Sequence, residues 1–307
     1  MSEQRARVFL PVGLLTAILA VSTASIFIRF AQQDAPSLVI AALRMTFATL
    51  LLTPVALIRY RDELRLLTRH ELLLSIFSGA FLAIHFATWI SSLEYTSVAS
   101  SVVFVSTGPL WVALLSPVFL KEHLSRTALL GLGLAIFGGA MIGLSDACMW
   151  RNGLVCPELQ EVLRGRTIWG NFLALVGAWS VTGYLMLGRK LRAKMSLIPY
   201  IFVVYGMAAV VLITTMFAAK QSPAGHPLKT YGWIFLLAVI PQLIGHSMYN
   251  WALRYLPAAF VAVTTLGEPI RSAILAYFLL DETPTTATIF GGALILAGIY
   301  LASRHDK

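Results

Sequence analysis

The sequence predicts an all-α integral membrane protein of ten transmembrane helices, arranged as two inverted repeats of five helices each. Hydrophobic residues make up 58% of the 307 positions and charged residues only 12%, which is more apolar surface than one soluble core can bury. A run of about 20 apolar residues spans a hydrocarbon core of about 30 Å. The runs of this kind are residues 9–31, 37–58, 72–93, 97–120, 127–145, 170–188, 197–219, 233–253, 258–280 and 285–303.

The second half of the chain repeats the first. Leu93 to Glu122 aligns without a gap with Leu253 to Glu282, and Pro109 falls on Pro269. Because each copy holds an odd number of spans, the two copies cross the membrane in opposite orientations, as in many secondary transporters. The predicted domains are a first repeat at 12–143, an extracytoplasmic connecting loop at 144–168 and a second repeat at 169–302.

The formal net charge of +9 has a plain cause in topology, because Lys and Arg gather in alternate loops such as 189–194. With both termini in the cytoplasm, these loops satisfy the positive-inside rule. We therefore expect a multi-pass protein of the cytoplasmic (inner) membrane that contacts lipid and has no nucleic-acid partner. Arg5 and Arg7 precede an apolar run that is too long for a signal peptide and ends without a small-residue cleavage site, so an uncleaved first span is predicted.

Two features of the repeats resemble a known family. The fourth and ninth helices are centred on proline and end in Lys121-Glu122 and Asp281-Glu282. Arg44 and Gly267-Glu268-Pro269 stand where the EamA repeats of the drug/metabolite transporter superfamily often carry an arginine and a Glu-Pro pair. The resemblance covers nearly the whole chain. It implies a carrier of small organic metabolites, and it leaves the substrate open among amino acids, nucleosides, cofactors and drugs.

The first two helices contrast in chemistry. Ser22 to Ser25 in the first helix are small residues that favour close helix packing. Arg44 lies within the second helix, where a guanidinium costs several kcal/mol unless it meets water or a partner. A cavity-facing Arg44 is the preferred interpretation, and a snorkelling or structurally paired arginine is the alternative.

The third helix carries a polar stripe. Ser78, His85 and Ser92 are seven residues apart, and Trp89 flanks them on the same side, so this side should face the protein interior. His85 is either a substrate contact or a hydrogen-bonded interior residue. A metal site has little support, because no second ligand stands at a suitable spacing.

The middle of the fourth helix holds Ser106-Thr107-Gly108-Pro109, where proline interrupts the backbone hydrogen bonds. Pro109 and its counterpart Pro269 are candidate hinges, with a simple packing kink as the alternative. The glycines of the fifth helix favour packing. In the connecting loop, Cys148 and Cys156 are a candidate disulfide, with unpaired thiols as the alternative.

The eighth helix mirrors the third, because Gln242, His246, Tyr249 and Asn250 follow at helical intervals. Aromatic side chains with polar tips suit an organic substrate, whereas the alternative is a hydrogen-bonded seam between helices.

The ninth helix supplies Glu268 and Arg271, which are spaced to pair on one face. Arg44 and Arg271 together outnumber Glu268 by one charge, which favours a substrate that bears a carboxylate. If the Glu268 pairing breaks in one conformation, Glu268 can take up a proton and couple transport to a gradient.

Together these patterns predict a carrier that moves an amino-acid-like or other carboxylate-bearing metabolite by alternating access, with export preferred by analogy. The predicted substrate-binding residues are Arg44, His85, Trp89, His246, Tyr249, Asn250, Glu268 and Arg271. No cofactor, metal or covalent chemistry is expected. The rival classes are a membrane-embedded enzyme, for which no catalytic motif is present, and a passive channel. A homodimer and a proton or other counter-ion remain open partners.

Overall fold

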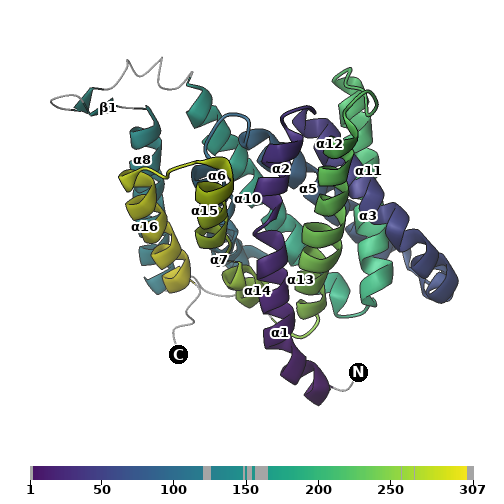
Figure 1. The fold of residues 1–307 in the computed structure, drawn as a ribbon. Coiled ribbons are helices and arrows are strands. Elements are labelled where there is room, and N and C mark those ends of the chain that lie inside the picture. The colour runs from purple at the N-terminus through teal and green to yellow at the C-terminus, as the bar shows by residue number, and fades with distance from the viewer. Residues whose placement is uncertain are drawn as a thin grey trace.

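The computed structural model describes residues 3–119, 126–147, 149–150, 154–155, 165–256, 258–265 and 267–302, and nearly all of these are helical (Figure 1). The connecting loop also contains two strands of two residues each, β1 (Met149–Trp150) and β2 (Leu154–Val155), which pair in an antiparallel hairpin. The predicted all-helical class is thus confirmed, with this hairpin as a minor addition. The candidate disulfide partners, Cys148 and Cys156, lie outside the described residues.

The helices follow the predicted apolar runs. In the first half they are α1 (Glu3–Val21), α2 (Ala24–Ala31), α3 (Ser37–Arg59), α4 (Arg61–Arg65), α5 (Arg69–Ser92), α6 (Val98–Val105), α7 (Gly108–Phe119) and α8 (Arg126–Ala147). In the second half they are α10 (Arg166–Arg192), α11 (Leu197–Ala218), α12 (Leu228–Leu237), the π-helix η1 (Ala238–His246), α13 (Ser247–Ala252), α14 (Ala258–Thr264), α15 (Gly267–Leu280) and α16 (Thr286–Ala302).

Six helical segments among the described residues are long and apolar enough to cross a membrane. They are Phe9–Ala31, Ser37–Arg59, Arg69–Ser92, Arg166–Arg192, Leu197–Ala218 and Leu228–Ala252. Val98–Val112 and Thr286–Gly298 are shorter apolar segments. The protein is therefore a multi-pass membrane protein, while the count of ten spans stays a prediction.

Three of the predicted continuous helices are broken near their middle. The first turns at Ser22 and Thr23, whose hydroxyls donate to the carbonyls of Ile18 and Ala20 and so compete with the backbone hydrogen bonds. The fourth turns at Ser106 and Thr107, between α6 and α7. The ninth is interrupted after Thr264, where α14 ends and Thr265 forms a turn, before α15 begins at Gly267.

The breaks place both candidate hinge prolines at the start of a helix. Pro109 is the second residue of α7 and Pro269 the third residue of α15. Proline is well tolerated there, because the first-turn N–H groups of a helix have no partner within the helix. The bending of either position during transport stays a prediction.

The eighth helix contains a wider segment instead of a break. η1 spans nine residues with π-type hydrogen bonding and includes Pro241. Such segments are rare and common at functional sites. Here it directly precedes α13, which carries Tyr249 and Asn250.

Helices from the two halves pack against each other in matching pairs. α3 packs on α11, α8 on α16, α5 on α10, and α1 on η1 and α13. Glycine permits the closest contact, because a side chain on Gly138 would collide with the Gly291 carbonyl and one on Gly298 with the Gly131 carbonyl. The described part of α1 begins, and that of α16 ends, at the same end of the bundle, opposite the β1–β2 hairpin (Figure 1).

Candidate functional site

A cavity lies among the helices of both halves; the space between its lining atoms is about 680 Å³ when the part open to solvent is included. Its lining is mainly apolar with a few polar groups, and consists of Val21, His85, Trp89, Val105, Ser106, Gly108, Pro109, Val181, Tyr184, Leu185, His246, Tyr249, Val261, Ala262, Thr265 and Glu268.

The third helix delivers His85 and Trp89 to the cavity, as the polar stripe predicted. The Nδ1 of His85 lies 2.9 Å from the carbonyl of Gly177 on α10. Because a carbonyl only accepts, Nδ1 donates, and a neutral His85 presents Nε2 as an acceptor. Trp89 stacks on His85 with ring centroids 5.7 Å apart, and its buried Nε1–H donor has no protein partner.

The eighth helix contributes His246 and Tyr249. The His246 ring lies 6.5 Å from the His85 ring, edge to face. The hydroxyl of Tyr249 is buried and has no hydrogen-bond partner. A buried hydroxyl without a partner costs free energy, so both Tyr249 and Trp89 are suited to donate to a bound molecule.

Glu268 is the acidic group of the cavity lining. Its side chain lies in the first turn of α15, directly after the helix break, and the residue is only 8% exposed. Among the described residues no hydrogen bond or ion pair engages its carboxylate. The expected pair with Arg271 is therefore not formed; Arg271 is half-buried and outside the cavity lining.

Arg44 lies behind the cavity wall instead of in its lining. It is fully buried, donates to the Oε1 of Gln242 at 2.9 Å, and stacks over the Phe86 ring at 4.0 Å from the centroid. Nε and the second terminal nitrogen have no hydrogen-bond partner. Arg44 is near enough to Glu268 for the two charges to interact electrostatically.

Asn250 also lies outside the cavity lining, in a polar seam between helices. Its amide donates to the hydroxyls of Tyr184 and Tyr205 and to the His246 carbonyl. Tyr205 in turn hydrogen-bonds Ser247. The alternative for the eighth helix, a hydrogen-bonded seam, thus describes its Asn250 side, whereas Tyr249 fits the substrate interpretation.

Other lining residues were not singled out from the sequence, in particular Tyr184, Val181 and Val21. The internal repeat could have identified some of these lining residues. Four pairs of lining positions lie 160 residues apart, the offset that aligns Leu93 with Leu253. They are Val21 and Val181, Trp89 and Tyr249, Val105 and Thr265, and Gly108 and Glu268.

The part of the chain that the structure describes contains no group of three or more His, Cys, Asp or Glu side chains that could hold a metal ion.

Comparison with known proteins places this arrangement in a family. The model of the EamA-like transporter family matches residues 10–144 and again residues 168–304. The chain belongs to the EamA-like transporter family. It is therefore a membrane-embedded transporter and not an enzyme, as the resemblance of its repeats implied.

The relatives are distant, and two of the three described here match over nearly the full length of both chains. The chain is 27% identical over 296 residues to an uncharacterized transporter of Archaeoglobus fulgidus, covering 95% of each chain. It is 24% identical over 298 residues to the pseudopaline exporter CntI of Pseudomonas aeruginosa, covering 96% of this chain and 97% of the other. A probable terminal-alkyne amino-acid exporter of Streptantibioticus cattleyicolor is 22% identical over 203 residues, or 66% of this chain and 63% of the other.

A solved protein crystal structure shares the fold. Its TM-score with this structure is 0.66 at 18% identity, over 95% of this chain and 96% of that chain. At such low identity the likeness shows the fold alone.

Proposed function

We propose that this EamA transporter exports an amino-acid-like substrate across the cytoplasmic membrane by alternating access. In this proposal ten spans form two inverted repeats, both termini are cytoplasmic, and the cavity is the substrate site. His85, Trp89, His246, Tyr249 and Glu268 contact the substrate. Arg44, Asn250 and Arg271 act from behind or beside the cavity.

The position of the cavity supports the inverted-repeat architecture. Each of the four pairs of lining positions takes one residue from each half of the chain. A site that lies on the pseudo-two-fold axis between repeats can open to either side by equivalent motions of the two halves. The start of α1 and the end of α16 lie at the same end of the bundle, which agrees with an even number of membrane crossings (Figure 1).

The carboxylate of Glu268, which has no hydrogen-bond or ion-pair partner among the described residues, is the single observation that carries the substrate class. A buried ionised carboxylate is costly unless a positive group balances it. Arg44 acts on Glu268 through its field alone, with no hydrogen bond or ion pair between these two described residues, whereas the ammonium group of an amino acid would be a direct positive partner and would donate hydrogen bonds to Glu268. The empty carrier can be neutralised there by a proton, so exchange of a proton for substrate is the coupling that this site allows.

The remaining groups match the other parts of such a molecule. Trp89 Nε1–H and the Tyr249 hydroxyl are unpartnered donors for a carboxylate, and Arg44 adds a positive field. Val105, Val181 and Val261 offer an apolar wall for the substrate side chain. The names of the Pseudomonas and Streptantibioticus relatives support export as the direction.

Binding and counterflow test this proposal. The purified protein would be screened by thermal shift against the twenty amino acids, because a ligand that binds the folded state raises its apparent stability. The best compound would then be used for counterflow in proteoliposomes. We expect saturable exchange, whereas non-saturating flux without counterflow would contradict a carrier. The screen would also include the decarboxylated amines of the same amino acids, and stabilisation by these amines but by no amino acid would contradict the substrate class.

A further inference from the structure

Two arginines in equivalent positions of the repeats hold equivalent loops. Arg29 lies near the end of α2, and Arg189, 160 residues later, lies in the last turn of α10. Arg29 donates to the Thr96 carbonyl at 3.2 Å, in the loop between α5 and α6. Arg189 donates to the carbonyls of Leu253 at 2.6 Å and Arg254 at 3.2 Å, in the loop between α13 and α14.

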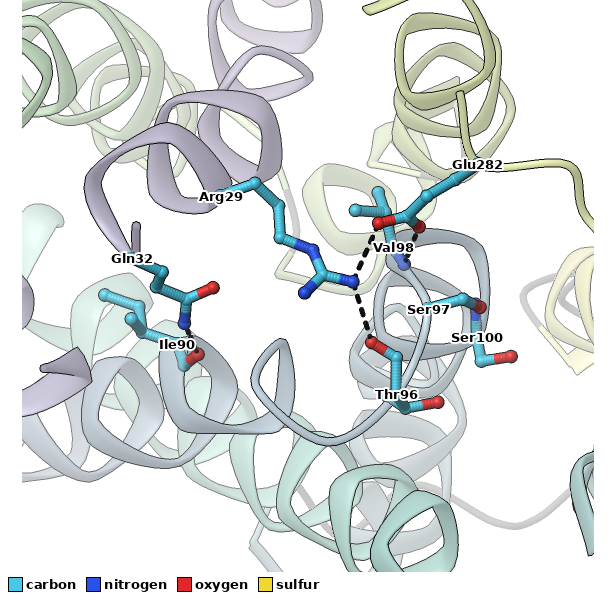
Figure 2. A network of polar contacts seen from close by, with 8 residues as sticks. All are labelled: Arg29, Gln32, Ile90, Thr96, Ser97, Val98, Ser100 and Glu282. Carbon is cyan, nitrogen blue, oxygen red and sulfur yellow. Dashed lines mark hydrogen bonds and ion pairs between the residues drawn. The ribbon is translucent and has the colours of Figure 1, made fainter. Parts of the chain in front are cut away.

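The Arg29 contact includes an ion pair. Arg29 also donates to Glu282 Oε1 at 2.7 Å, and Glu282 Oε2 accepts from the Val98 backbone N–H at 2.8 Å (Figure 2). Both side chains of the ion pair are about three-quarters buried, with 27% and 25% exposure. The Arg29 guanidinium and the Glu282 carboxylate thus connect the end of α2, the start of α6 and the loop that follows α15.

The two contacts lie at opposite ends of the bundle. Thr96 packs beside Gly170 and bonds to Asn171, near the start of α10. Arg189 follows Gly170 by 19 residues on the same helix. At about 1.5 Å per residue this separates the contacts by about 28 Å, close to the thickness of a hydrocarbon core.

Each contact joins helices that line the cavity. Val105 on α6 and Glu268 on α15 are lining residues, and α2 follows the lining residue Val21. At the other end, α10 contributes Val181 and Tyr184. Each contact therefore constrains the ends of helices that line the cavity.

We propose that Arg29 with Glu282, and Arg189 with the Leu253–Arg254 carbonyls, are two clamps that close opposite mouths of the cavity and release alternately. The inference rests on the alternating access of the proposed function. In the proposed orientation the Arg29 clamp closes the outer mouth and the Arg189 clamp the inner one. A clamp must break when its mouth opens, because the loop and helix ends that it joins then separate.

Sided labelling of the cavity tests the clamps without knowledge of the substrate. A Ser106→Cys reporter in the cavity lining, with Cys148→Ser and Cys156→Ser, would be labelled by a membrane-impermeant maleimide in right-side-out and inside-out vesicles. Arg29→Ala and Glu282→Gln are each expected to raise outer labelling about fivefold and lower inner labelling, since one charged hydrogen-bonded contact is lost from the outward-closed state. Arg189→Ala is expected to do the opposite.

The matched control is Lys229→Ala, which breaks the more exposed Lys229–Asp34 ion pair, 3.2 Å long, near the same end. It should leave labelling from both sides unchanged. Combining Arg29→Glu with Glu282→Arg restores the ion pair but loses the hydrogen bonds to the Thr96 carbonyl and from the Val98 N–H, so outer labelling should fall below that of Arg29→Glu alone without reaching the parent value. This comparison also tests the clamp if Arg29→Ala or Glu282→Gln fails to fold.

Unchanged sidedness in Arg29→Ala and Glu282→Gln, or equal outer labelling in the charge-exchanged variant and in Arg29→Glu alone, would overturn the outer clamp. A variant whose labelling rises from both sides at once would instead contradict alternating access, and with it the carrier proposal itself.

Discussion

Two sides of the same membrane segment, η1 with α13, differ in how their polar atoms are satisfied. Toward the cavity, the Tyr249 hydroxyl is buried without a partner. One residue further along, Asn250 Nδ2 donates to Tyr184, Tyr205 and the His246 carbonyl, while its Oδ1 is buried without a partner among the described residues. The two residues show that one polar stripe on a helix can contain a structural half and a binding half. An unpaired polar atom alone does not distinguish the binding half; its position in the cavity lining does.

The largest effect is expected on the cavity side, from Glu268→Gln. This variant removes the charge that should bind the ammonium group but keeps the shape of the side chain. Because hydrogen bonds to charged groups contribute about 1.5–3 kcal/mol, counterflow should fall by roughly 10- to 100-fold, with little change in thermal unfolding.

The matched control is Asp62→Asn, which neutralises an exposed carboxylate on α4. It should transport like the parent. Equal losses in both variants would mean that Glu268 acts through net charge alone, and a large drop in melting temperature for Glu268→Gln would mean that it is structural.

On the seam side, Asn250→Leu should damage stability and spare binding. The substitution leaves the Tyr184 hydroxyl and the His246 carbonyl without the amide donor, at a cost of roughly 1–2 kcal/mol. Thermal unfolding in detergent should register this loss, while the affinity of the ligand found by thermal shift stays within about twofold. A tenfold loss of affinity at unchanged stability would place Asn250 in the site.

A pair of tyrosines gives the smallest and sharpest contrast. Tyr249→Phe removes an unpaired hydroxyl, so we expect weaker ligand binding by about fivefold and no loss of stability. Tyr205→Phe removes a hydroxyl that bonds Ser247 and Asn250, so we expect about 1 kcal/mol less stability and unchanged affinity. Binding and unfolding measured on both variants check the contrast, and a reversed pattern would contradict it.

The sequence was sufficient to predict what depends on local pattern. Hydropathy predicted the membrane helices, the repeat predicted equivalent positions, and helical spacing placed His85 and Trp89 on the interior side of the third helix. Local pattern also indicated the breaks beside Pro109 and Pro269, although it missed the break at Ser22 and Thr23.

Features that depend on packing between the two halves could not be read in this way. The partner of Arg44 is Gln242, 198 residues away, and the partner of Arg29 is Glu282, 253 residues away. Residue spacing suggested Arg271 as the ion-pair partner of Glu268, because spacing identifies only neighbours on the same helix. Neighbouring residues such as Tyr249 and Asn250 point about 100° apart on a helix, and only the arrangement of the other helices decides which one meets the cavity.

The most direct test of the account is a binding cycle that removes the ammonium group and the Glu268 charge separately and together. Affinities of the parent and of Glu268→Gln would be measured by calorimetry for the best amino acid and for its deaminated analogue. The account predicts that the parent loses roughly tenfold or more in affinity without the amine, whereas the Glu268→Gln variant binds the two compounds almost equally. Equal sensitivity to the amine in both proteins would contradict a contact between Glu268 and the substrate.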